Sequence, residues 1–270
     1  MKHNGPRPPR AENDTPPTAR TQIYGLLPVL EALRAGRRTV NQLTLVEGAQ
    51  DHRLQEIITL ARAQNIPVRR APRNELARLT QNANHQGVLA TIAAVGYADP
   101  DKLLDTLTAP RAGGPAPLLV VLDGVEDPRN LGAIVRTVEC AGAQGVFIPE
   151  RRAAGLTDTV AKTAAGALEH IPVARVTNIT RLLADLQERG IWTVGTDAVA
   201  AMDYTAWDWT LPCAVVMGGE GAGLHRLVRE RCDALVKIPL HGRLSSLNVS
   251  VATGIILYEA QRQRALRGTS

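Results

Sequence analysis

The sequence predicts an α/β protein built from two units of unequal size. In residues 117–270, short apolar runs alternate strictly with helical patterns, which is typical of a mostly parallel sheet covered by helices on both faces. In residues 21–97, helical and extended patterns also alternate, but over a shorter span. Between them, residues 109–117 hold three prolines and two glycines, so no regular element is expected there.

These patterns divide the chain into four segments. Residues 1–20 are rich in Pro, Arg, Thr and Asn and lack the apolar core of a signal peptide, which favours a disordered basic arm. Residues 21–97 form the small domain, and residues 98–116 form a linker with one short polar helix. Residues 117–270 form the large domain.

The small domain is expected to alternate helices and strands. Leucines recur at helical spacing over residues 26–33, before Gly36, and a second helix is expected over residues 54–61. Extended patterns predict strands over residues 43–46, 66–69 and 88–95.

In the large domain the apolar runs predict six strands, over residues 118–122, 145–148, 173–176, 192–195, 214–217 and 235–238. Helices are expected over residues 130–142, 156–168, 179–189, 223–231 and 247–265. The last of these is apolar on almost every side and is expected to be buried. Ligands of parallel sheets bind at the carboxyl ends of the strands, so a ligand-binding site is expected in the loops that follow the strands.

Composition excludes several classes of protein. No apolar run is long enough to span a membrane. The three cysteines show no CxxC or metal-ligand spacing, so we expect no metal site and an intracellular location with reduced thiols. Hydrophobic residues make up 44% of the chain but aromatic residues only 3%, so the cores must be built from Leu, Val, Ile and Ala.

The positive charge is concentrated in the first third of the chain. Residues 1–97 carry thirteen basic and seven acidic side chains, whereas residues 117–270 carry sixteen of each. Arginines cluster near residues 34–38 and 69–78. This asymmetry suits a polyanion such as RNA, although a solvated basic surface would give the same pattern.

A glycine-rich turn, Met217-Gly-Gly-Glu-Gly-Ala-Gly-Leu224, follows the fifth strand of the large domain. It resembles a dinucleotide fingerprint only superficially, because the strand lies late in the chain and the spacing is wrong. No Gly-Lys-Ser/Thr of a Walker A loop occurs either. What remains is a turn whose backbone can approach a ligand closely and which carries one carboxylate, Glu220.

Two further segments carry polar residues beside apolar helices. Asn248 is expected to begin the last helix, just after Ser245 and Ser246. Asn130 is expected at the N-cap of the helix over 130–142. Arg136 interrupts the apolar row of that helix, so it should pair with an acid such as Glu220 or contact a phosphate.

Taken in order, residues 130–136, 217–224 and 238–254 resemble the three motifs of the SpoU (TrmH-like) branch of the SPOUT RNA methyltransferases. Tyr24-Gly25, His85-Gln-Gly87 and Leu122-Asp-Gly-Val-Glu-Asp-Pro-Arg-Asn-Leu-Gly132 are similar to the subgroup that methylates a guanosine 2'-hydroxyl of 23S rRNA. The resemblance covers residues 21–270. One departure is Gly219, where many members carry Ser or Ala.

The resemblance implies a carboxy-terminal SPOUT domain with a deep trefoil knot that binds S-adenosylmethionine, preceded by a small L30e-like RNA-binding domain. In that family the residue matching Arg136 activates the ribose hydroxyl. Glu220 would orient Arg136, either within one chain or across a dimer interface, while Asn130, Ser246 and Asn248 would position the substrate. The cofactor contacts implied are Gly195, Val215, Met217, Gly218, Gly219, Gly221, Leu224, Ile238, Leu240 and Leu247.

The expected partners follow from the same resemblance: 23S rRNA, a second copy of the chain in a homodimer, and no membrane or metal, in the cytoplasm. The residues expected to contact RNA are Arg34, Arg37, Arg38, Arg69, Arg70 and His85. A tRNA 2'-O-methyltransferase or an rRNA resistance methylase is the alternative within the class. A non-catalytic rRNA-binding assembly factor is the alternative outside it, although such a protein would not need all five residues expected to be catalytic.

Overall fold

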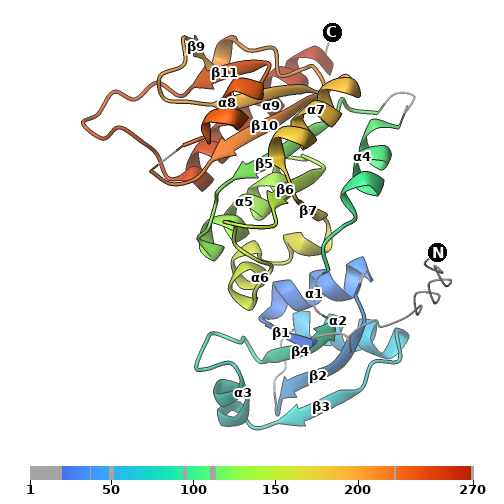
Figure 1. The fold of residues 1–270 in the computed structure, drawn as a ribbon. Helices are drawn as coiled ribbons and strands as arrows, with labels where there is room; N and C mark the ends of the chain where they lie inside the picture. The colour runs from blue at the N-terminus through green and yellow to red at the C-terminus, as the bar shows by residue number, and fades with distance from the viewer. Residues whose placement is uncertain are drawn as a thin grey trace, which may run out of the picture.

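The computed structural model describes residues 20–36, 38–48, 52–93, 96–109, 114–221 and 223–268. The described elements form two separate sheets, one of four strands and one of seven, which lie at opposite ends of an elongated molecule (Figure 1). Nearly all of the predicted arm, and Arg37, lie outside the described residues.

The four-stranded sheet of the amino-terminal domain has the order β1-β4-β2-β3. Strand β4 pairs antiparallel with β1 and β2, while β2 and β3 are parallel. Helices α1 and α2 contribute to its main apolar core. The elements are β1 (Arg20–Tyr24), α1 (Leu26–Ala35), β2 (Val40–Val46), α2 (His52–Ala63), β3 (Val68–Ala71), α3 (Arg73–Leu79) and β4 (Val88–Ala93).

Two elements of this domain were not predicted. Strand β1 is Arg-Thr-Gln-Ile-Tyr, which is too polar to stand out beside the basic arm. Helix α3 begins after Pro72 and buries only Leu76 completely, so its sequence shows an arginine cluster rather than an apolar stripe.

The seven-stranded sheet is parallel throughout and has the order β7-β6-β5-β10-β8-β11-β9. This confirms the predicted parallel sheet; the two-residue strand β9 at its edge was not predicted. The strands are β5 (Leu118–Asp123), β6 (Gly145–Pro149), β7 (Val173–Val176), β8 (Trp192–Thr196), β9 (Met202–Asp203), β10 (Cys213–Gly218) and β11 (Ala234–Lys237).

Helices cover both faces of this sheet, as predicted. Alternate residues of β5 face opposite cores: Val120 packs with α5, α6 and α9, whereas Val121 packs with α4, α7 and α8. The helices are α4 (Pro100–Thr108), α5 (Pro128–Cys140), α6 (Asp158–Ala164), α7 (Ile179–Glu188), α8 (Arg226–Arg231) and α9 (Val249–Gly268), with short 3-10 helices η1 (Ala167–Glu169) and η2 (Tyr204–Ala206). The trefoil knot stays a prediction.

The predicted linker over 98–116 is wrong for its first half. Leu103 and Leu104 of α4 are buried in the core that also contains α7. The backbone N–H of Ala98 donates to the carbonyl of Val173 at the sheet edge, at 2.8 Å. Helix α4 therefore belongs to the large domain.

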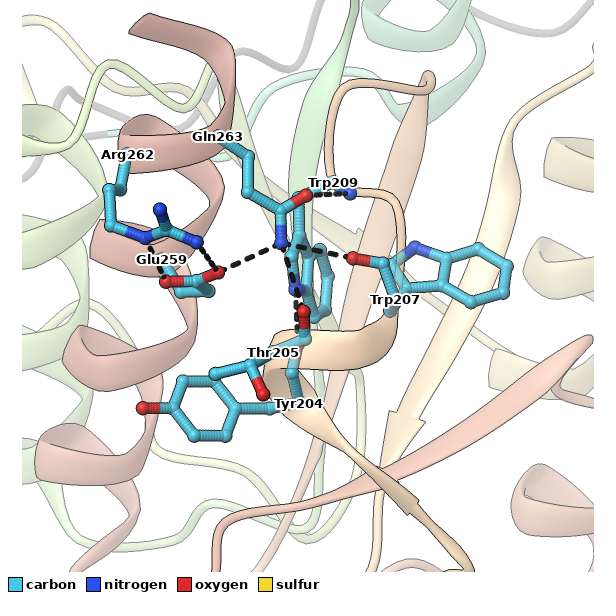
Figure 2. A network of polar contacts seen from close by, with 7 residues as sticks. All are labelled: Tyr204, Thr205, Trp207, Trp209, Glu259, Arg262 and Gln263. Atoms are coloured by element: carbon cyan, nitrogen blue, oxygen red, sulfur yellow. Dashed lines mark hydrogen bonds and ion pairs between the residues drawn. The ribbon is translucent and has the colours of Figure 1, made fainter. Parts of the chain in front are cut away.

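A polar network fixes the middle of α9 against the segment that follows β9 (Figure 2). Gln263 accepts a hydrogen bond from the backbone N–H of Trp209 at 2.9 Å and donates to the carbonyl of Trp207 at 3.1 Å. The indole of Trp209 is fully buried and donates to the carbonyl of Tyr204 at 2.7 Å. Glu259 accepts from Arg262 and Gln263, which holds the glutamine in place.

The sequence predicts a buried last helix, but the single chain buries α9 only in part. Ile256 and Leu257 are fully buried, but Val251 is 51% exposed and Tyr258 is 55% exposed. Leu247, just before the helix, is also exposed. Helix α9 therefore presents an apolar strip to solvent in the single chain.

The two domains are joined by a buried ion pair. Arg38, which follows α1, pairs with Glu169 of η1, and their side chains are only 10% and 1% exposed. Arg38 also donates to the carbonyl of Ala93 at 3.2 Å. More peripheral contacts add to this joint, including His170 Nε2 with Glu31 at 3.0 Å.

Glu169→Ala should destabilise the protein by about 3 kcal/mol, because it leaves the buried guanidinium of Arg38 without its counter-charge. The double variant Arg38→Met, Glu169→Leu should recover most of that loss. Urea unfolding of each variant measures the change. Glu230→Ala, which breaks the exposed pair with Arg226, is the matched control and should cost less than about 1 kcal/mol. An equally small effect of Glu169→Ala would contradict a structural role for the pair.

Candidate active site

Three segments that are distant in the sequence meet through a carboxylate and two carboxamides. Asn130 donates from Nδ2 to Glu220 Oε1. Asn248 donates from Nδ2 to Asn130 Oδ1 at 3.0 Å and lies 3.4 Å from Glu220 Oε1. We call these three residues the Asn–Glu–Asn cluster. They come from α5, from the turn after β10 and from the residue before α9.

Asn130 does not occupy the position that the sequence predicts. The N-cap of α5 is Asp127, whose side chain accepts from the backbone N–H of Arg129 at 2.8 Å, with Pro128 at the first helical position. Asn130 lies in the first turn and is buried. Its carboxamide is therefore available to bind Glu220 and Asn248 instead of capping the helix.

Asn248 has two roles at once. Its Oδ1 accepts from the backbone N–H and the hydroxyl of Ser250, at 2.9 and 2.6 Å, so it caps α9 as predicted. Its Nδ2 faces the other way, toward Asn130 and Glu220. The start of α9 thereby fixes the orientation of the cluster.

A cavity of about 490 Å³ lies beside the cluster, between the loops that follow β8, β10 and β11 and the start of α9. Its volume is within the range of small-molecule sites. Eight of the ten predicted cofactor residues line it: Met217, Gly218, Gly219, Gly221, Leu224, Ile238, Leu240 and Leu247. Glu220 and Ser246 of the predicted catalytic set line it as well.

The other two predicted cofactor residues do not line the cavity. Val215 is fully buried in the core within strand β10. Gly195 is buried, and a Cβ added to it would lie 2.8 Å from the side chain of Leu235. Both residues are buried next to residues that line the cavity, and their contact with the cofactor stays a prediction.

Polar residues that the sequence did not single out also line this cavity, namely Thr196, Asp197, Arg229 and Lys237. Asp197 pairs with Arg229. Partial burial alone would raise the pKa of the Asp197 carboxyl, but the Val199 N–H and Arg229 together hold that pKa below its usual value. In the sequence, the position of Asp197 directly after a strand of the parallel sheet is the feature that could have indicated its place in the site.

The glycine-rich turn folds back onto itself at Gly218. A Cβ on Gly218 would lie 2.1 Å from the carbonyl carbon of Gly223, and a Cβ on Gly219 would lie 2.2 Å from the carbonyl oxygen of Gly124. Glycine at 219 therefore allows the turn to approach the loop after β5 closely.

Arg136 lies on the exposed side of α5, so the predicted burial in an apolar row is wrong. Among the described residues it forms no ion pair with Glu220, whose carboxylate instead accepts from the two asparagines. Ser245 and Ser246 are also exposed, in the loop before α9. A single chain thus brings together three of the five predicted catalytic residues.

The predicted RNA-binding residues differ in their accessibility. Arg38 is engaged in the joint between the domains. His85 is buried, and its Nδ1 accepts from the N–H of Gly87 at 3.0 Å. Burial, together with Arg73, lowers the pKa of its imidazole. In the single chain, Arg38 and His85 are therefore both engaged with other parts of the protein, and RNA contact by them stays a prediction.

Of the remaining predicted arginines of the small domain, Arg34, Arg69 and Arg70 are exposed, and Arg37 lies outside the described residues. Arg34 pairs with Glu31 and Glu56, and Arg69 pairs with Glu75. Arg70 lies on the edge strand β3. Within the described part of the chain, no group of three or more His, Cys, Asp or Glu side chains could hold a metal ion. No helix there is both long and apolar enough to cross a membrane.

Two family models match the chain and divide it as the sheets do. The SpoU rRNA Methylase family matches residues 117–258. The model described as RNA 2'-O ribose methyltransferase substrate binding matches residues 22–98.

Several relatives match over almost their whole length. YacO of Bacillus subtilis, whose name assigns it to the TrmH family of tRNA/rRNA methyltransferases, is 46% identical over 90% of this chain and 95% of its own. The 23S rRNA (guanosine-2'-O-)-methyltransferase RlmB of Pseudomonas syringae is 45% identical over 91% of this chain and 97% of its own. The SpoU methyltransferase AviRb of Streptomyces viridochromogenes, solved with AdoMet, superposes with a TM-score of 0.75 at 26% identity and covers 92% of this chain and 91% of its own.

Gly218→Ala should weaken S-adenosylmethionine binding by about 10-fold or more, equivalent to about 1.4 kcal/mol. The added Cβ would force the turn away from Gly223 and distort the cavity wall. Isothermal titration calorimetry measures the affinity. Gly242→Ala is the control, because nothing lies within 4 Å of its Cβ position. Equal affinities for both variants would show that the turn does not shape the cofactor site.

Proposed function

Because this chain belongs to the SpoU rRNA methylase family, we propose that it methylates the ribose 2'-hydroxyl of a guanosine in 23S rRNA. Family membership itself makes the protein an S-adenosylmethionine-dependent RNA 2'-O-ribose methyltransferase. The choice of guanosine and of 23S rRNA is supported by the RlmB relatives. The observation that carries the reaction is the Asn–Glu–Asn cluster at the edge of the 490 Å³ cavity.

The cavity fits the cofactor in its chemistry. Its apolar walls include Leu224, Ile238 and Leu247, which suit an adenine ring, and the glycine-rich turn brings main-chain groups to the same space. The ion pair of Asp197 with Arg229 and the side chain of Lys237 supply charge at the edge, which suits the amino-acid end of the cofactor. When bound, S-adenosylmethionine supplies an electrophilic methyl group on its sulfonium centre.

The chain's own residues must then align a weakly acidic hydroxyl with that methyl group. Alignment dominates such a transfer, because an in-line attack needs no covalent help from the protein. Asn130 and Asn248 hold the Glu220 carboxylate in one orientation. We assign Glu220, Asn130 and Asn248 to positioning of the target ribose, and exposed Ser246 to contact with the adjoining RNA backbone.

Arg136 is assigned to the developing alkoxide. A guanidinium stays protonated, so its role is to stabilise negative charge on the attacking oxygen and not to remove the proton outright. Arg136 is exposed on α5, and α5 packs against α9, whose strip of Val251 and Tyr258 is exposed. A homodimer formed through this strip would cover the apolar surface and supply Arg136 to the neighbouring site.

The small domain is the second contact with RNA. The exposed arginines on and beside β3, including Arg70, Arg73 and Arg78, suit phosphate contacts that carry no sequence information. An rRNA substrate also implies that the protein works in the cytoplasm. The alternative within the same chemistry is tRNA methylation, which is supported by the name of the YacO relative.

The proposal is tested by incubating the protein with methyl-labelled S-adenosylmethionine and either unmodified large-subunit rRNA or tRNA, followed by mapping of ribose methylation. A single 2'-O-methylguanosine in the rRNA is the expected result. Label in tRNA alone would favour the alternative substrate. Cofactor binding without transfer to either RNA would contradict the proposal.

Arg136→Ala should lower kcat by about 100-fold or more, as expected when one stabiliser of a developing oxyanion is lost. Cofactor affinity should remain at the wild-type value, because Arg136 does not line the cavity. Arg181→Ala, which removes an exposed arginine of α7, is the matched control and should leave both quantities unchanged. Parallel losses of kcat and cofactor affinity would show that Arg136 is structural.

A further inference from the structure

A second cavity adjoins the Asn–Glu–Asn cluster and is distinct from the 490 Å³ cavity, here called the cofactor cavity. It measures about 510 Å³ and lies between the loop after β5, the loop after β6 and the residue before α8. Asn130 lines it, and it shares Gly219, Glu220 and Gly223 with the cofactor cavity. A molecule in this space would therefore lie directly beside the residues assigned to the target ribose.

Most of the polar groups that line this cavity are already satisfied by protein partners. The buried carboxylate of Asp123 accepts from the backbone N–H of His225 at 2.8 Å and pairs with its Nδ1 at 2.9 Å. Asp127 caps α5. Asn130 and Glu220 bind each other. These groups shape the cavity, but their hydrogen bonds are already made to other groups of the protein.

Two charged side chains that line the cavity lack such protein partners among the described residues. Glu126 and Arg152 both line the cavity and are exposed. Neither forms a hydrogen bond or ion pair with any residue that the structure describes. Arg152 also has a φ of 56°, so its backbone lies in the left-handed region that residues other than glycine rarely adopt. The cavity thus offers one free carboxylate and one free guanidinium beside the site of methyl transfer.

This pair of charges matches one nucleobase. Guanine presents the acceptors O6 and N7, which arginine binds with two hydrogen bonds. Its N1–H and 2-amino group are donors that a carboxylate accepts. Adenine has no acceptor at position 6 and no 2-amino group, and the pyrimidines lack N7. Resting on the proposed function, we propose that this cavity is the subsite for the target base, in which Arg152 reads O6 and N7 of guanine and Glu126 reads N1–H and the 2-amino group.

The test combines protein variants with base analogues in a synthetic RNA that spans the mapped methylation site. Wild-type protein should methylate the guanosine RNA with a kcat/KM roughly 10- to 100-fold above the inosine and 7-deazaguanosine RNAs, because each analogue removes one contact. Glu126→Gln should lower kcat/KM more on guanosine than on inosine, which lacks the 2-amino group but keeps N1–H. Arg152→Met should likewise lower it more on guanosine than on 7-deazaguanosine, which lacks N7 but keeps O6.

Matched controls lie next to Arg152 in the chain. Glu150→Gln and Arg151→Met remove exposed charges that do not line the cavity, so both should retain the wild-type preference among the three RNAs. Unchanged cofactor affinity in every variant, measured by calorimetry, shows that the fold is intact.

Several outcomes would overturn the inference. If Arg152→Met lowers kcat/KM equally on all three RNAs, Arg152 contacts a phosphate and does not read the base. If wild-type protein methylates the ribose of a nucleotide other than guanosine, the subsite is wrong while ribose methylation stands. If labelled cofactor binds but no RNA is methylated, the proposed function and the subsite both fail.

Discussion

A carboxylate and two carboxamides hold together three loops that are remote in the sequence. Glu220 accepts from Asn130, 90 residues before it, and lies near the amide of Asn248, 28 residues after it. Each asparagine is itself held by the start of a helix, α5 or α9. The cofactor cavity and the second cavity meet at Glu220. This cluster holds the loops after β5, β10 and β11 in position relative to one another. The shapes of both cavities therefore depend on it.

The sequence predicts the large sheet well because its strands are buried on both faces and form nearly continuous apolar runs. Leu118 to Leu122 are all fully buried, as that pattern requires. The small domain is predicted less completely, since β1 and α3 have few buried residues. Eight of ten cofactor residues line the cavity because glycines and polar residues after parallel strands mark the ligand-binding edge of such a sheet.

The differences between the expected and the observed structure have a common physical origin in contacts that local sequence patterns do not encode. Arg38 belongs to a charge cluster that suggests RNA binding, and in the structure it pairs with Glu169, 131 residues away, which the cluster does not indicate. Helix α9 was predicted to be buried from its composition, but Val251 and Tyr258 are exposed. An apolar helix is expected to be buried against other protein surface. Its composition does not show whether that surface belongs to the same chain or to a second copy.

The most direct test of this account is the pH dependence of methyl transfer by Asn130→Asp. The substitution keeps the size of the side chain but places a second carboxylate beside Glu220. Two carboxylates at this distance raise the pKa of one of them, and below that raised pKa they share a proton. If the cluster positions the ribose, the variant should show a large loss of kcat near neutral pH, unchanged cofactor affinity and partial recovery relative to wild type as the pH falls. Wild-type kcat at neutral pH would contradict the central role of the cluster.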